Sequence, residues 1–96
     1  MSKVLELLDT PEKWTQGAAA RDIEGKPIKA TSYHAVSWSL LGALDRVVHP
    51  VHFQKVYQQY VLNVMNKGYI NLSQWNDTTG RTYADVVALI HEVEEG

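Results

Sequence analysis

Two stretches of helical periodicity stand next to each other in the middle of this sequence, separated only by His49 and Pro50. In the first stretch, residues 33–48, apolar residues recur at the spacing of one helical face; they are Val36, Leu40, Ala43, Leu44 and Val47. The second stretch, residues 51–67, carries a stripe of apolar and aromatic side chains with glutamine and lysine opposite. Because the link is so short, we expect the second helix to pack back against the first. The first helix, with Ser32 as its N-cap, is the expected centre of the fold.

Shorter helices are expected on both sides of this pair. Ser2 and Asn71 each stand where a side-chain oxygen can accept from the free N–H groups of a first helical turn. Thr82 and Asp85 have the spacing of a capping box, with aspartate in place of the usual glutamate. The predicted helices cover residues 2–9, residues 71–76 and the stretch that follows Thr82.

Residues 18–29 have a different pattern, which predicts a short β-hairpin. Asp22 can bond the backbone ahead of it, and Gly25 can adopt a positive φ in the turn. Pro27 lacks an N–H group, so its strand must lie at a sheet edge. The predicted fold class is therefore mainly α: a compact bundle of about four to five helices with a small hairpin, in one globular domain over residues 1–96.

The composition excludes several classes of protein. The chain has no cysteine, which excludes a disulfide scaffold and a thiolate zinc site. Its net charge of −2, with scattered basic residues, gives no electrostatic footprint for nucleic acid, so we expect no such partner. No stretch is apolar and long enough for a membrane span, and no secretory signal is visible, so we expect no membrane association and a cytoplasmic location.

Three short motifs resemble a known family. They are A-R-D at 20–22, W-x-x-L-G-A-L at 38–44 and W-N-D-x-x-G-R-T at 75–82. Together with the segment from Trp14 to Ala18, they resemble a family of small bacterial and phage proteins known only as a domain of unknown function, over residues 14–90. Family members often carry a cysteine where this chain has Ser39. The resemblance implies the order of the elements and assigns no activity, cofactor or site.

The three tryptophans, Trp14, Trp38 and Trp75, are expected to converge in the core. Their burial would hold the polar turn that follows Trp75. In that turn we expect Gly80 to supply an unusual φ and Thr82 to cap the next helix. These five residues are the predicted structural anchors.

Five polar residues are candidates for binding a ligand or partner: Arg21, Asp22, Asn76, Asp77 and Arg81. One interpretation is structural, with Arg21 reaching Asp77 and Asp22 reaching Arg81, so that the hairpin is braced against the turn. The other interpretation is an open polar pocket beside a helix N-terminus, in which an unpaired arginine binds an anion. We favour the structural interpretation, because each residue type has its own role in a turn or cap.

No complete catalytic or metal-binding set stands out. His49 and His52 have a spacing that can share a metal, but a site needs three or four ligands, and we expect neither a metal nor a cofactor. Ser37 and Ser39 lack the glycines of a nucleophile elbow, so no catalytic residue is predicted. The aromatic stripe of Phe53, Tyr57 and Tyr60 is either core or a binding surface, and we favour core.

The leading hypothesis is therefore a non-enzymatic interaction module that binds a protein partner or a second copy of itself, in a phage or mobile-element setting. The alternative hypothesis is a protein that binds a small molecule or anion, or a weak enzyme, with the five polar residues as its site.

Overall fold

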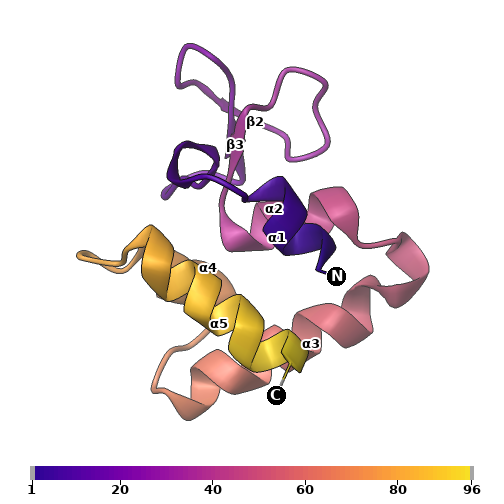
Figure 1. Cartoon of the computed structure of the whole chain (residues 1–96), viewed down its shortest axis with the longest axis vertical. Helices are drawn as coiled ribbons and strands as arrows, with labels where there is room; N and C mark the ends of the chain where they lie inside the picture. The colour runs from indigo at the N-terminus through magenta and orange to yellow at the C-terminus, as the bar shows by residue number, and fades with distance from the viewer. Residues whose placement is uncertain (1, 96) are drawn as a thin grey trace.

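The computed structural model describes residues 2–95, and it confirms a mainly helical fold. Its helices are α1 (Lys3–Leu7), α2 (Leu40–Val47), α3 (Pro50–Asn66), α4 (Leu72–Asp77) and α5 (Tyr83–Glu95). A 3₁₀ turn, Pro11–Lys13, follows α1. A small sheet contains β1 (Ala20–Arg21), β2 (Pro27–Ile28) and β3 (Ser37–Trp38). In Figure 1 the sheet and its two connecting loops project from one end of the helical part.

The sheet has the order β2-β1-β3, with both pairs antiparallel. Ala20 lies between Ile28 on one side and Trp38 on the other. The predicted hairpin is present, with Gly25 at a φ of 83° and Pro27 on the edge strand. The third strand was not predicted, because its two residues belong to a stretch with helical periodicity.

The prediction of a helix over 33–48 is wrong in its first half. Residues 37–38 are a strand, and α2 begins at Leu40 with Ser39 as its cap, where the Ser39 hydroxyl accepts from the Gly42 N–H at 3.1 Å. Ser32 instead accepts from the His34 N–H within a turn. Pairing with β1 outweighs the local pattern, since the Ser39 N–H also donates to the Ala19 carbonyl at 3.1 Å.

Other predicted ends of helices are confirmed. The Ser2 and Asn71 side chains cap α1 and α4. At the start of α5, the Thr82 N–H donates to Asp85 and the Asp85 N–H donates to the Thr82 hydroxyl, both at 3.1 Å. Gly80, in the turn just before, has a φ of 86°.

The α2–α3 corner also follows from local chemistry. Pro50 is the first residue of α3, and His49 caps it by accepting from the Val51 N–H through Nδ1. On α3, Tyr60 is fully buried, whereas Phe53 and Tyr57 are partly buried and stack with ring centroids 5.6 Å apart. The aromatic stripe thus belongs to the core at Tyr60 and lies at the edge of the core at Phe53 and Tyr57.

The core joins helices from both ends of the chain. Its largest fully buried side chains are Tyr60, Leu8, Leu40, Leu44, Leu72, Ile90, Val64, Val86 and Asn76. The Tyr60 hydroxyl donates to Glu94 on α5 at 2.5 Å. Burial, together with that hydrogen bond and the charge of Glu94, raises the pKa of Tyr60. The Tyr83 hydroxyl donates to the Leu8 carbonyl, which ties α5 to the end of α1.

Within residues 2–95, every helix is too short or too polar to span a membrane.

Candidate functional site

Asn76, in the last turn of α4, joins three parts of the chain. Its Oδ1 accepts from the Trp14 indole N–H at 2.7 Å and from the Leu40 N–H at 3.0 Å. Its Nδ2 donates to the Thr15 carbonyl at 3.1 Å and to Asp77 Oδ1 at 2.9 Å. The side chain is fully buried and all of its hydrogen-bonding capacity is used. Asn76 therefore has a structural role, as a polar link between α4, the start of α2 and the segment after the 3₁₀ turn.

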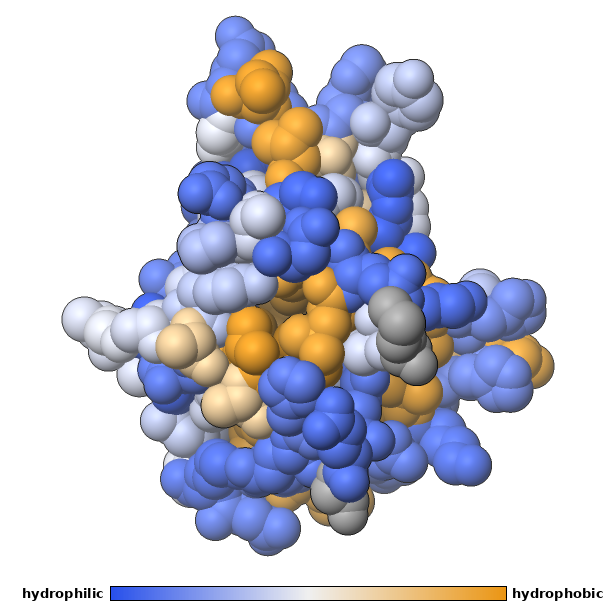
Figure 2. Space-filling view, viewed as in Figure 1, coloured by the Kyte–Doolittle hydropathy of each residue, from blue (hydrophilic) through white to orange (hydrophobic). Residues whose placement is uncertain are grey.

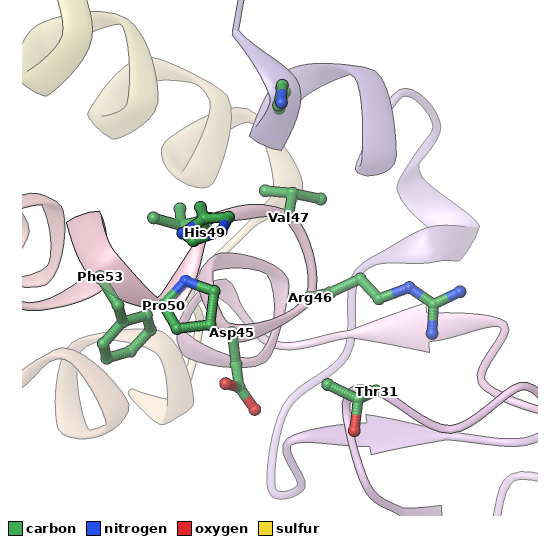
Figure 3. Close-up of a pocket in the computed structure, with 9 residues that line it drawn as sticks. Thr31, Asp45, Arg46, Val47, His49, Pro50 and Phe53 are labelled. Atoms are coloured by element: carbon green, nitrogen blue, oxygen red, sulfur yellow. The ribbon is translucent and has the colours of Figure 1, made fainter.

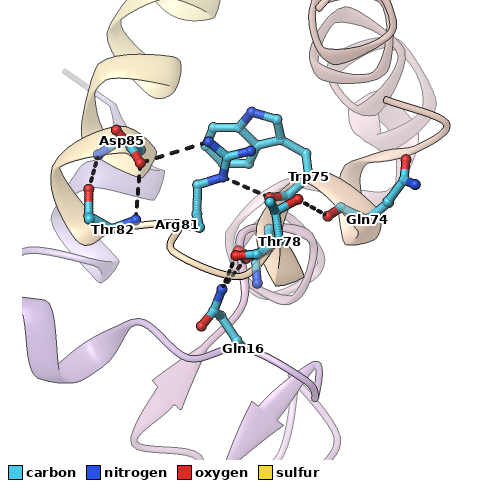
Figure 4. A network of polar contacts seen from close by, with 8 residues as sticks. Gln16, Gln74, Trp75, Thr78, Arg81, Thr82 and Asp85 are labelled. Carbon is cyan, nitrogen blue, oxygen red and sulfur yellow. Dashed lines mark hydrogen bonds and ion pairs between the residues drawn. The ribbon is translucent and has the colours of Figure 1, made fainter. Parts of the chain in front are cut away.

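Asp77 and Gln16 extend the same link. Asp77 Oδ1 accepts from the Gly17 N–H at 3.0 Å. The Gln16 amide donates to the carbonyls of Asn76 and Thr78 at 2.8 and 3.1 Å, as Figure 4 shows in part. Asp77 also borders a small cavity of about 230 Å³ with Gly17 and Ser39. The contacts of Asp77 hold the 14–17 segment against α4.

The three tryptophans are joined through polar links. Trp14 and Trp38 form a backbone bridge, and the Trp14 indole donates to Asn76. The Trp38 indole donates to the Ala30 carbonyl at 2.9 Å, and Trp75 is buried beneath Arg81. Among residues 2–95, the aromatic ring pairs include no tryptophan.

The expected braces between hairpin and turn are wrong. Arg21 donates to the Thr15 hydroxyl and to the carbonyls of Gln16 and Gly25, at 2.9–3.0 Å. Asp22 accepts from the N–H groups of Glu24 and Lys26 at 2.9 Å and so closes its own turn. Groups close by along the chain satisfy both residues: Asp22 binds within the hairpin, whereas Arg21 also reaches back to the 14–17 segment.

Arg81 has different surroundings, shown in Figure 4. Its guanidinium carbon lies 4.0 Å from the centre of the Trp75 ring and 5.2 Å from that of Tyr69. Nε donates to the Trp75 carbonyl at 2.8 Å, and Nη1 lies 3.8 Å from Asp85, beyond hydrogen-bond distance. Nη2 is buried without a hydrogen-bond partner.

The five candidate residues therefore do not line one pocket. Asn76, Asp77 and Arg21 each bond to the 14–17 segment, Asp22 closes the turn of the hairpin, and Arg81 lies over Trp75. These residues come from two separate motifs, and each motif divides its side chains among different neighbours.

A larger hollow, which the sequence did not indicate, lies at the α2–α3 corner (Figure 3). Three adjoining cavities of about 650, 470 and 450 Å³ all border Lys3 and Val47. We name this continuous hollow the corner groove; its apolar walls come from Val4, Leu7, Val47, Val48, Phe53, Val56 and Val93. In Figure 2, apolar side chains are exposed between α1 and α5 and are surrounded by hydrophilic ones.

His49 and His52 both border the corner groove. Their ring centroids are 6.2 Å apart, and His49 Nδ1 is occupied by the cap of α3. No group of three metal-ligating side chains gathers anywhere in residues 2–95. Val47 is part of the apolar face predicted for 33–48, and helical periodicity alone does not distinguish a core residue from one that lines a groove.

Comparison with known families agrees with the motifs. A family model described as a family of unknown function, DUF6197, matches residues 1–95. The chain belongs to this family. The DUF6197 match covers the A-R-D, W-x-x-L-G-A-L and W-N-D-x-x-G-R-T motifs, and it confirms the resemblance to a family of unknown function. This DUF6197 protein matches none of the curated proteins or solved structures with which we compared it.

Proposed function

We propose that this DUF6197 protein is a non-enzymatic interaction module that binds an apolar segment of a partner protein in the corner groove. The observation that carries the proposal is the continuity of the groove. It runs from Thr31 past Val47 to Val93, so it touches the loop before β3, the α2–α3 corner and four helices, α1, α2, α3 and α5.

The groove has the anatomy of a protein interface. Its floor is apolar, and charged side chains of both signs, Lys3, Arg46, Asp45 and Glu94, stand on its border. Each cavity has the size of a small-molecule pocket, and the three adjoin at Lys3 and Val47, so together they offer room for a peptide segment. An amphipathic segment with apolar anchors every three or four residues fits such a surface.

A charge placed on the floor of the groove tests the proposal. Val47→Lys puts an ammonium group where the partner's apolar side chains would pack, and Val51→Lys puts the same group on α3 outside the groove, at a residue that is 74% exposed. The tagged wild type and both variants are expressed in the natural host of the protein and purified from it. The proteins that accompany each are quantified by mass spectrometry. Thermal unfolding establishes that each variant is folded.

We expect a partner that is retained by the wild type and by Val51→Lys and is lost with Val47→Lys. Sedimentation of the purified protein distinguishes this result from self-association, in which the solution mass doubles and Val47→Lys restores the monomer. A set of accompanying proteins that is the same for all three chains, with a monomeric mass throughout, contradicts the proposal.

A further inference from the structure

A second groove runs along α5, from Asp85 to Glu92, and is lined by Arg81, whose Nη2 lacks a hydrogen-bond partner. This hollow, of about 310 Å³, lies between α4, α5 and the segment at the end of α3. We name it the Arg81 groove. It combines two cations, two rings and two carboxylates: Lys67, Arg81, Tyr69, Trp75, Asp85 and Glu92.

The hydrogen bonds of the Arg81 guanidinium are incomplete at one edge. The Nε side is satisfied by the Trp75 carbonyl. At the other edge, Nη2 has no partner and Nη1 is 3.8 Å from the Asp85 carboxylate. That edge is the fork of two parallel donors that binds the two oxygens of a carboxylate.

This incomplete edge is unusual for a side chain so well buried. The Arg81 side chain is only 13% exposed, and a buried cationic donor without an acceptor is costly. The Trp75 and Tyr69 rings offset part of that cost and fix the plane of the guanidinium. The other arginine stacked on a tryptophan provides a contrast: Arg46, 5.6 Å from the Trp38 ring, donates its Nη1 to the Ser32 carbonyl at 2.9 Å.

We propose that the Arg81 groove binds a monocarboxylate with an apolar body, and that the fork of Arg81 receives the carboxylate. The walls contributed by Tyr69, Trp75 and Leu89 match the apolar body. This site is separate from the corner groove and does not depend on the proposed protein partner.

The charged side chains around the Arg81 groove favour a ligand with one negative charge over a ligand with two. Lys67 and Arg81 are balanced by Asp85 and Glu92, so a dianion such as phosphate meets two carboxylates, whereas a monoanion gains the fork at a lower electrostatic cost. Lys67 is already bonded to Glu92 at 2.5 Å, and this bond, together with Asn63, lowers the pKa of Glu92. Both side chains of that pair are well exposed, at 39% and 51%, and can rotate outward as a ligand enters.

The three tryptophans allow the site to be tested directly by NMR. Phenylacetate is titrated against the full chain, labelled with ¹⁵N, and the indole N–H signals of Trp14, Trp38 and Trp75 are followed. We expect a saturable shift of the Trp75 signal alone, because the other two indoles are bonded to Asn76 and to the Ala30 carbonyl outside the groove. Inorganic phosphate at the same ionic strength should give no saturable shift.

Three variants complete the experiment. Arg81→Lys keeps the charge and loses the fork, and it should weaken phenylacetate binding about tenfold or more. The matched control, Arg46→Lys, should bind as the wild type does. Glu92→Gln, at an exposed position, removes one carboxylate and should tighten binding severalfold, and this variant decides the matter if Arg81→Lys does not fold.

Other outcomes overturn the proposal. They are a Trp75 signal that does not move with phenylacetate, shifts that map to the corner groove, equal binding by Arg81→Lys and the wild type, or a stronger response to phosphate than to phenylacetate. An unchanged affinity in Glu92→Gln likewise refutes the electrostatic argument on which the choice of a monoanion rests.

Discussion

Replacement of Gly42 by alanine should destabilise this protein, although the same change in most helices is stabilising. Gly42 lies in the first turn of α2, where helix propensity alone favours alanine by about 1 kcal/mol. A Cβ atom at this position, however, would lie 1.9 Å from the Ala19 carbonyl oxygen and 2.8 Å from its carbon. These are backbone atoms, so no side chain can rotate to make room.

The magnitude follows from the movement that would be required. Ordinary van der Waals contact begins near 3.4 Å, so α2 and the segment before β1 would have to separate by about 1.5 Å. That movement breaks the hydrogen bond from the Ser39 N–H to the Ala19 carbonyl, now 3.1 Å long. Overpacking of about 1–3 kcal/mol and an unpaired N–H group on the buried Ser39, of similar cost, outweigh the gain in propensity. We expect a net loss of about 3 kcal/mol.

Urea denaturation followed by tryptophan fluorescence measures this loss, and a fall in Tm of about 12–24 °C should accompany it. Gly80→Ala is the matched control. Gly80 has a φ of 86° but no neighbouring atom within 4 Å of the added Cβ, so only the backbone cost of about 1–2 kcal/mol applies. If Gly42→Ala is as stable as the wild type, or more stable, the close approach of α2 to the sheet is refuted.

Three further predictions concern the core and the start of α2. Asn76→Ala leaves buried donors of two other segments unpaired and should cost about 3–5 kcal/mol in urea denaturation; a loss below about 1 kcal/mol would contradict the linking role of Asn76. Tyr60 keeps its proton in the folded state because its pKa is raised above the ordinary 10.0, so its contribution to stability is complete below pH 10 and falls as the pH rises beyond it. Tyr60→Phe should lower stability at neutral pH by about 1 kcal/mol and flatten the alkaline decline, and an unchanged decline would show that Tyr60 does not cause it. Ser39→Ala should cost about 1 kcal/mol through the lost cap of α2 while Ser32→Ala costs less, and the reverse order would restore a helix that starts near residue 33.

Local chemistry was sufficient to predict many turns and helix ends. Ser2 and Asn71 act as caps, the pair Thr82 and Asp85 forms its capping box, and Gly25 has the positive φ expected of its turn. Each of these features depends on residues within about four positions of one another, so the information is present in a short stretch of sequence.

Contacts between distant segments could not be predicted in this way. The periodicity of 33–48 fits one helix, yet pairing of Trp38 with Ala20 makes residues 37–38 a strand, and the helix begins only at Leu40. Arg21 and Arg81 each belong to a short polar motif, so the sequence offers no reason to treat them differently. Arg21 is satisfied by the Thr15 hydroxyl and by the carbonyls of Gln16 and Gly25, whereas Arg81 lies over the Trp75 and Tyr69 rings with a buried Nη2 that has no partner.

The pattern of apolar residues, caps and glycines in this chain thus specifies a mainly helical domain with a hairpin, because helix and turn formation respond to neighbours along the chain. The corner groove, the Arg81 groove and the linking role of Asn76 arise from the way the five helices meet. The packing of segments that are distant in the sequence decides which polar atoms form hydrogen bonds, because backbone groups compete with side chains for every buried donor and acceptor.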